Sequence, residues 1–103
     1  MAKAAAFKAF TRRALHRDEV HYRTHATDAK GTPAASLIVN VTVMGMMARC
    51  EMAGDIGDCV RVSLPVVGTV EAKIRWTLGG RAGFELTLPI ALADYDAVLL
   101  AMR

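Results

Sequence analysis

Residues 59–78 read CVRVSLPVVGTVEAKIRWTL, and apolar and polar side chains alternate along most of this stretch. Alternation is the period of a β-strand with one buried face, whereas a helix repeats every three to four residues. We therefore predict two strands, at 59–65 and 68–78. Their inward positions would be Val60, Val62 and Leu64 in the first strand, and Val70, Ala72, Ile74 and Trp76 in the second.

Strand character continues on both sides of this stretch, between segments rich in turn-forming residues. Residues 34–52 are apolar enough for a helix, but their β-branched side chains and Gly45 favour two strands joined by a turn at 42–45. The further predicted strands are 19–27, 35–41, 46–52 and 84–88, separated by turns at 28–33, 53–58 and 79–83. The last of these strands would turn Phe84, Leu86 and Leu88 inward.

Residues 91–102 have helix character and follow Pro89, which ends the last predicted strand. Their apolar residues recur at a spacing of three to four: Leu92, Tyr95, Leu99 and Met102. Six short strands and a terminal helix predict an all-β fold, a six-stranded antiparallel β-barrel capped by the C-terminal helix. Residues 12–103 would form this single domain and residues 1–11 a flexible tail.

The composition is that of a globular chain, with 103 residues of which 53% are hydrophobic and 22% charged. Two cysteines, Cys50 and Cys59, are too few for a disulfide framework, and we expect both to be small buried residues in a reducing compartment. The N-terminus has no apolar run typical of a signal peptide, and no segment approaches the ~18 apolar residues of a membrane span. We therefore expect a cytoplasmic protein without a membrane span.

The positive charge is concentrated in the N-terminal part of the chain. Residues 1–23 hold six basic and two acidic residues, a net charge of +4, whereas the remainder has a net charge of −1. Such asymmetry indicates an anionic partner, or else an arm that only aids solubility. Nucleic acid is disfavoured as the partner, because 6% aromatic residues offer few surfaces on which bases could stack.

Catalytic and metal sites have little support in the sequence, and we predict that the protein is not an enzyme. Ser36 and Ser63 lack a nucleophile elbow or a paired base. On a strand, His21 and His25 would lie ~13 Å apart, too far to share a metal ion. We expect no metal and no cofactor.

Two motifs remain, and each combines groups that suit a polar ligand. Arg13 and Arg17 are four residues apart, with Arg12 beside them, and their planar guanidinium groups suit phosphate oxygens or the edge of a guanine. Residues 40–45 read NVTVMG and place an amide, a hydroxyl and a glycine at a predicted turn. Each residue of this turn also has a purely structural explanation: Asn40 could bond its own backbone, Thr42 could be an ordinary strand residue, and Gly45 could supply a positive φ.

Together, Arg13-x-x-x-Arg17 and Asn40-x-Thr42-x-x-Gly45 resemble the RxxxR and [D/N]xSxxG motifs of PilZ domains, with threonine in place of the family's serine. The run at 60–86 is also similar to that family's strands, and the resemblance covers residues 11–102. It implies a split β-barrel whose basic arm, residues 12–18, binds the bacterial second messenger cyclic di-GMP. The residues implied in binding are Arg12, Arg13, Arg17, Asn40, Thr42 and Gly45.

The resemblance also implies how the protein would act. A chain with a single domain would relay the signal to a protein effector in trans, in processes such as motility or biofilm formation. Some PilZ domains are degenerate, and the alternative is therefore an adaptor that does not bind the nucleotide and works through protein contacts alone.

Overall fold

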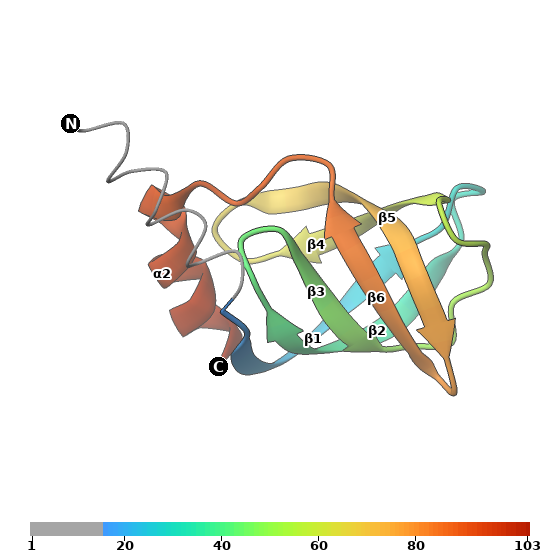
Figure 1. The fold of residues 1–103 in the computed structure, drawn as a ribbon, viewed down its shortest axis with the longest axis horizontal. Coiled ribbons are helices and arrows are strands. Elements are labelled where there is room, and N and C mark those ends of the chain that lie inside the picture. Colours follow the sequence, from blue (N-terminus) through green and yellow to red (C-terminus); the bar gives the residue numbers. More distant parts are fainter. Residues whose placement is uncertain (1–15) are drawn as a thin grey trace.

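A computed structural model describes residues 16–103, and these residues form a closed β-barrel with one helix across its end (Figure 1). The strand order around the barrel is β1-β2-β3-β6-β5-β4, and every neighbouring pair is antiparallel. The elements are β1 (Asp18–Thr27), β2 (Pro33–Val41), β3 (Gly45–Arg49), β4 (Cys59–Leu64), β5 (Gly68–Leu78), β6 (Arg81–Leu86) and α2 (Leu92–Met102). The predicted six-stranded barrel with a C-terminal helix is confirmed.

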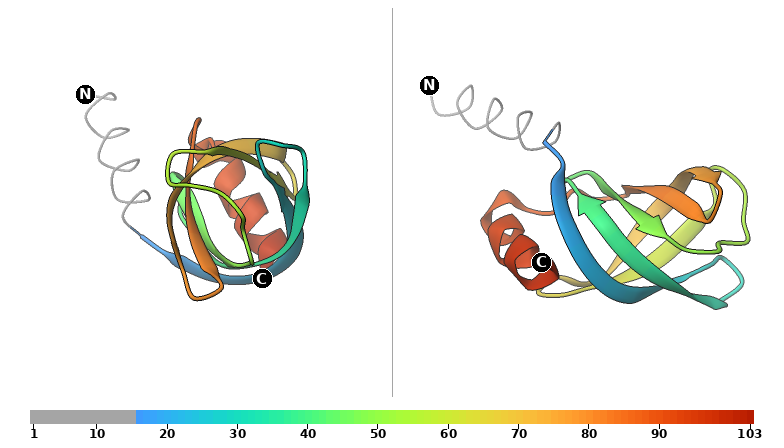
Figure 2. Two further views of the ribbon diagram at one scale, coloured as in Figure 1. Left: turned by 90° about the vertical axis from the view of Figure 1, so that its right-hand side faces the viewer. Right: turned by 90° about the horizontal axis from the view of Figure 1, so that it is seen from below.

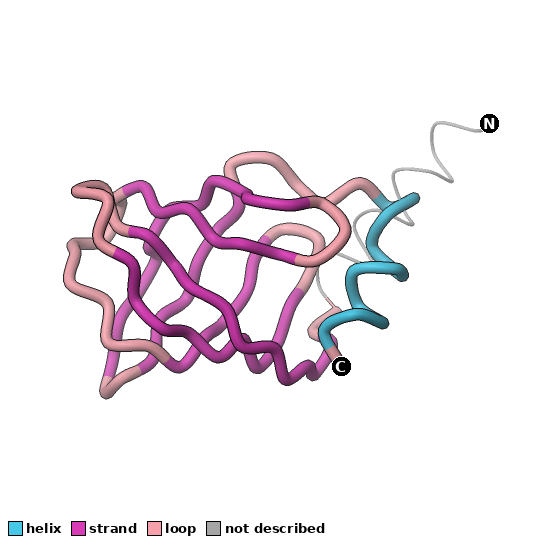
Figure 3. The backbone as a smooth tube through the Cα atoms, turned by 180° about the vertical axis from the view of Figure 1, so that it is seen from behind, coloured by secondary structure: helices cyan, strands magenta, loops and turns pink. Residues whose placement is uncertain are grey.

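The core fills the barrel and continues beneath the helix. Figure 2 shows α2 lying across one end of the barrel, and Figure 3 shows the longer loops gathered mainly at the opposite end. The helix buries Tyr95, Val98, Leu99 and Met102 against the barrel. Leu92, which was expected on the same face, is 37% exposed at the start of the helix. None of the helices within residues 16–103 is long and apolar enough to cross a membrane.

Local turn chemistry explains why one predicted strand was placed too late. Gly79 and Gly80 both have positive φ, which a two-residue hairpin turn requires and which glycine adopts without strain. Pairing with β5 therefore resumes at Arg81, so that β6 runs from 81 to 86 rather than from 84 to 88. Leu88 is 79% exposed, in contrast to the prediction, because the chain has already left the barrel; Ile90 is buried instead.

Cys59 also differs from its prediction. Cys50 is buried, as expected, but Cys59 is exposed, because the alternation of β4 turns the odd-numbered positions outward. Burial raises the pKa of the Cys50 thiol, and a hydrogen bond with Ser36 opposes that effect. The two cysteines therefore lie in different environments.

The predicted strand 46–52 is shorter in the structure, since β3 ends at Arg49.

Candidate functional site

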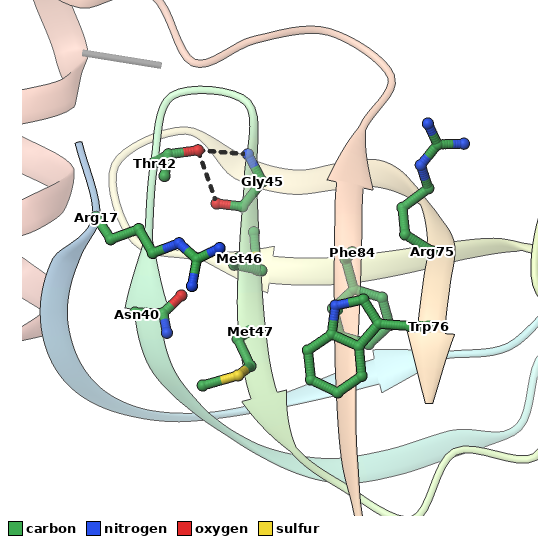
Figure 4. Close-up of a pocket in the computed structure, with 10 residues that line it drawn as sticks. Arg17, Asn40, Thr42, Gly45, Met46, Met47, Arg75, Trp76 and Phe84 are labelled. Carbon is green, nitrogen blue, oxygen red and sulfur yellow. Dashed lines mark hydrogen bonds between the residues drawn. The ribbon is translucent and has the colours of Figure 1, made fainter. Parts of the chain in front are cut away.

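A pocket of about 340 Å³ opens on the outside of the barrel where β1, β2, β3, β6 and β5 lie side by side. Its residues come from both predicted motifs and from two strands that the motifs do not include (Figure 4). They are Arg17, Asn40, Thr42, Gly45, Met46, Met47, Arg75, Trp76, Gly83 and Phe84.

The strand register explains why these residues meet. Asn40 pairs with Met47, Met47 pairs with Gly83, and Gly83 pairs with Trp76, so that these four positions lie in one row across four strands. Arg17 immediately precedes β1 and extends toward this row in Figure 4. Residues far apart in the sequence thus form one surface.

The Thr42 hydroxyl organises the turn between β2 and β3. It accepts hydrogen bonds from the backbone N–H groups of Met44 and Gly45, with Oγ1–N distances of 3.0 and 3.1 Å. The Thr42 N–H also donates to the Gly45 carbonyl oxygen at 2.8 Å. Thr42 therefore forms the turn as well as lining the pocket, and it is not the ordinary strand residue of the purely structural explanation, because β2 ends at Val41.

The same turn is attached to the segment that leads into the helix. Leu86 N–H donates to the Met44 carbonyl oxygen at 2.7 Å, and Ile90 N–H donates to the Val43 carbonyl oxygen at 2.8 Å. Val43 is fully buried. These contacts hold one wall of the pocket in place before any ligand arrives.

Gly45 is required by close packing rather than by a positive φ. It is not among the glycines of positive φ, which are Gly31, Gly57, Gly68, Gly79 and Gly80. A Cβ atom at position 45 would collide with the backbone carbonyl oxygen of Phe84 on β6. A side chain here would therefore push β3 away from β6 and distort the floor of the pocket.

Trp76 reaches the pocket because β5 has an irregularity just before it. The register shifts between Ile74 and Trp76, and a bulge of this kind changes the direction of a side chain. Trp76 is therefore 38% exposed instead of inward, in contrast to the prediction. Its indole lies against Gly83, where a Cβ atom would collide with the ring. In the sequence, the glycine of the pair Gly83–Phe84 was the feature that could have indicated a place where an aromatic ring packs closely on the backbone.

The polar groups of the pocket differ in whether they have partners. Within residues 16–103, Arg17 forms no salt bridge and the Asn40 amide forms no hydrogen bond. Arg75 is engaged, with its Nε 2.7 Å from Glu85 Oε2. One guanidinium and one amide therefore remain available to a ligand.

Beside Arg17, the first residue of β1 is tied to the helix. The Tyr95 hydroxyl lies 2.6 Å from Asp18 Oδ2 and 3.1 Å from the Val41 carbonyl oxygen. His16 Nε2 lies 3.1 Å from Asp18 Oδ1. The Asp18 carboxylate thus connects His16 to α2, and the Tyr95 hydroxyl connects α2 to β2.

The structure brings Arg17, Asn40, Thr42 and Gly45 together in one pocket. Arg12 and Arg13 lie outside the described residues. The sequence reasoning missed Arg75, Met47 and Gly83 as pocket residues and was wrong to place Trp76 in the interior. Phe84 is buried as predicted, and it also borders the pocket. Of the two methionines that flank Gly45, Met46 lines the pocket and Met44 does not. In the part of the chain from 16 to 103, no three His, Cys, Asp or Glu residues are grouped so as to hold a metal ion.

No family model matches the chain, and no curated protein matches it either. Among solved structures, the chain is similar to the PilZ domain of CeSA from a cellulose-synthesizing bacterium, with a TM-score of 0.64 and 15% sequence identity. The match covers 82% of this chain and 93% of that domain. The chain has a PilZ-type fold. At this identity the similarity to the PilZ domain concerns the fold, and the pocket described above is a property of this chain's own residues.

Proposed function

We propose that this protein binds cyclic di-GMP in the pocket between Arg17 and Trp76 and relays the signal to a partner protein in trans. The supporting observation is that Arg17, Asn40, Thr42 and Gly45, the described residues of both motifs, line one pocket. A bacterial second messenger would be met in the cytoplasm, in keeping with the expectation from the sequence.

Each group in the pocket suits a part of a guanine dinucleotide. The Arg17 guanidinium can donate two parallel hydrogen bonds to a phosphate or to the O6 and N7 atoms of guanine. The Asn40 amide can both donate and accept at a base edge. The partly exposed face of Trp76 offers a surface on which a purine can stack. Arg12 and Arg13 would add further cationic contacts from the arm.

Thr42 would act on the ligand through the backbone. Because its hydroxyl oxygen already accepts two N–H groups, its main role is to hold the turn that carries Gly45. Serine can supply the same oxygen, so the replacement of the family's serine by threonine keeps the feature on which the turn depends.

Titration calorimetry with cyclic di-GMP on the parent and on Arg17→Ala tests the proposal. We expect micromolar or tighter binding by the parent, and a loss of about 1.5–3 kcal/mol, roughly tenfold or more, when the charge-assisted contact is removed. Arg61→Ala is the matched control, because Arg61 is an exposed arginine of β4 outside the pocket, near Glu71. No heat from the parent, at concentrations where an affinity of ~10 μM would register, contradicts the proposal.

A second candidate is an adaptor that does not bind the nucleotide. Exposed leucines near the helix favour it, with Leu88 at 79% and Leu100 at 74% exposure. The same calorimetry separates the two candidates, because only the first predicts heat that depends on Arg17.

A further inference from the structure

A second row of outward-facing side chains crosses the barrel beside the pocket, and neither motif includes it. Arg23 pairs with Leu37, Leu37 with Arg49, Arg49 with Arg81, and Arg81 with Leu78, on β1, β2, β3, β6 and β5. We call these five residues the basic row. Its three arginines are exposed, Leu37 is half-buried between two of them, and Leu78 is 77% exposed at its end.

The arginines of the basic row are not paired with carboxylates in salt bridges within the described part of the chain, although the Glu51 carboxylate lies beside Gly80, the neighbour of Arg81. None of its arginines forms a salt bridge there, and the salt bridges of residues 16–103 involve other cations. Arg49 and Arg81 lie directly opposite each other on adjacent strands. Like charges in that position repel each other and destabilise a sheet. A bound anion would therefore reduce an electrostatic repulsion that exists in the free protein.

The charge is also local to this part of the surface. Residues 16–103 hold nine basic and ten acidic residues, and their net charge is therefore −1. A depression of about 470 Å³ lies at one end of the row, lined by Arg23, His25, Leu37 and Arg49 among others. Attraction of an anion here would thus depend on this particular group of arginines and not on the overall charge of the barrel.

The length and chemistry of the basic row select the kind of partner. Five strands at a spacing of ~4.8 Å extend over ~19 Å along the curved wall of the barrel, a length that a flexible peptide segment can follow. A single phosphate is much shorter. The row contains two leucines and no aromatic residue, whereas single-stranded nucleic acid is usually held by aromatic stacking.

We propose that the basic row binds an acidic peptide segment of a partner protein. Carboxylates of the segment would pair with Arg23, Arg49 and Arg81, and apolar side chains between them would pack on Leu37 and Leu78. The row lies two residues along β3, β6 and β5, and three along β2, from the pocket row of Asn40, Met47, Gly83 and Trp76. This proposal does not require nucleotide binding. If the pocket does bind a nucleotide, the short distance between the pocket and the basic row would favour transfer of the signal to the partner.

Fluorescence anisotropy with a labelled peptide of the sequence Glu-Leu-Glu-Glu-Leu-Glu tests the proposal on the full chain. We expect the double variant Arg49→Gln/Arg81→Gln to bind at least about tenfold more weakly than the parent, because two charge-assisted contacts are lost. Arg61→Gln/Arg103→Gln removes the same charge elsewhere and should change the affinity less than about twofold. Thermal melts should show the Arg49→Gln/Arg81→Gln variant to be at least as stable as the parent, which excludes unfolding as the cause.

Three results would overturn the proposal. One is the absence of peptide binding by the parent up to about 1 mM, and another is an equal loss of affinity in both double variants, which would indicate unspecific attraction by any basic residue. The third is tighter binding of a six-nucleotide single strand than of the peptide, with a larger loss of affinity for the strand in the Arg49→Gln/Arg81→Gln variant. Amide chemical shifts that move at the basic row on adding peptide would support the proposal, whereas shifts confined to other strands would contradict it.

Discussion

The oxygen of a single hydroxyl holds the turn at the edge of the pocket. At Thr42 the backbone N–H groups of Met44 and Gly45 converge on this oxygen, and loss of the oxygen would leave both donors without their acceptor in the hairpin. An unmade hydrogen bond of this kind costs more than the bond itself contributes. The side chain at position 42 therefore acts on the stability of the turn and on the shape of the pocket together.

Replacement of Thr42 by valine should destabilise the protein by about 1–3 kcal/mol, since the shape is kept while the acceptor is lost. Urea denaturation measures this change, and calorimetry should show weaker binding of cyclic di-GMP by the same variant. Thr42→Ser retains the acceptor and should remain close to the parent in both measurements. A valine variant as stable as the parent would show that the hydroxyl does not hold the turn.

The two cysteines should differ in reactivity because their environments differ. The raised pKa of buried Cys50 leaves less thiolate at a given pH, whereas Cys59 is exposed on the outward face of β4. With a thiol-specific disulfide reagent at pH 8, one thiol should react rapidly and the second only after denaturation. Cys59→Ser should remove the rapid phase. Equal rates for both thiols in the folded protein would contradict this prediction.

At the scale of elements, α2 and the start of β1 are linked by a buried tyrosine. Tyr95 is 1% exposed, and its hydroxyl contacts both Asp18 and the Val41 carbonyl oxygen. Arg17, a pocket residue, immediately precedes Asp18 in the chain, so that the pocket and the helix are linked through this contact.

Tyr95→Phe should lower the free energy of unfolding by about 1.5–3 kcal/mol, because a hydrogen bond to a charged group is lost. Tyr22→Phe is the matched control, since the Tyr22 hydroxyl makes no hydrogen bond within residues 16–103. Urea denaturation of both variants measures the difference. A loss at Tyr95 no greater than the loss at Tyr22 would show that the link to Asp18 contributes no stability.

The strands themselves were largely predictable, because alternation and turn residues are local signals. Residues 68–78 form β5 as predicted, and β1, β2 and β4 lie within two residues of their predicted bounds. The errors at β6 and at Trp76 arose where a tight turn or a β-bulge shifts the alternation of inward and outward residues. The short Gly79–Gly80 turn moved β6, and the shift before Trp76 turned that side chain out of the barrel.

At the scale of the whole molecule, the barrel is closed by its shortest seam. Only Ala26 and Thr27 of β1 pair with β4, opposite Val62 and Arg61, and the Thr24 hydroxyl donates to the Ser63 carbonyl oxygen at 2.6 Å. Strand alternation predicts a sheet, but closure depends on the twist and stagger accumulated over all six strands. The prediction of a closed barrel therefore came from the need to pair exposed strand edges, and no single segment of the sequence specifies closure.

By itself, the sequence determined the strands, the helix, the two motifs and the uneven charge, because periodicity, turn chemistry and charge are properties of neighbouring residues. The tertiary structure decided which residues share a surface. The register across β2, β3, β6 and β5 brought Trp76 and Gly83 to the same pocket as Asn40, and it aligned Arg49 with Arg81. Such pairings join residues that are tens of positions apart, and they follow from the stagger of the barrel, which local patterns do not specify.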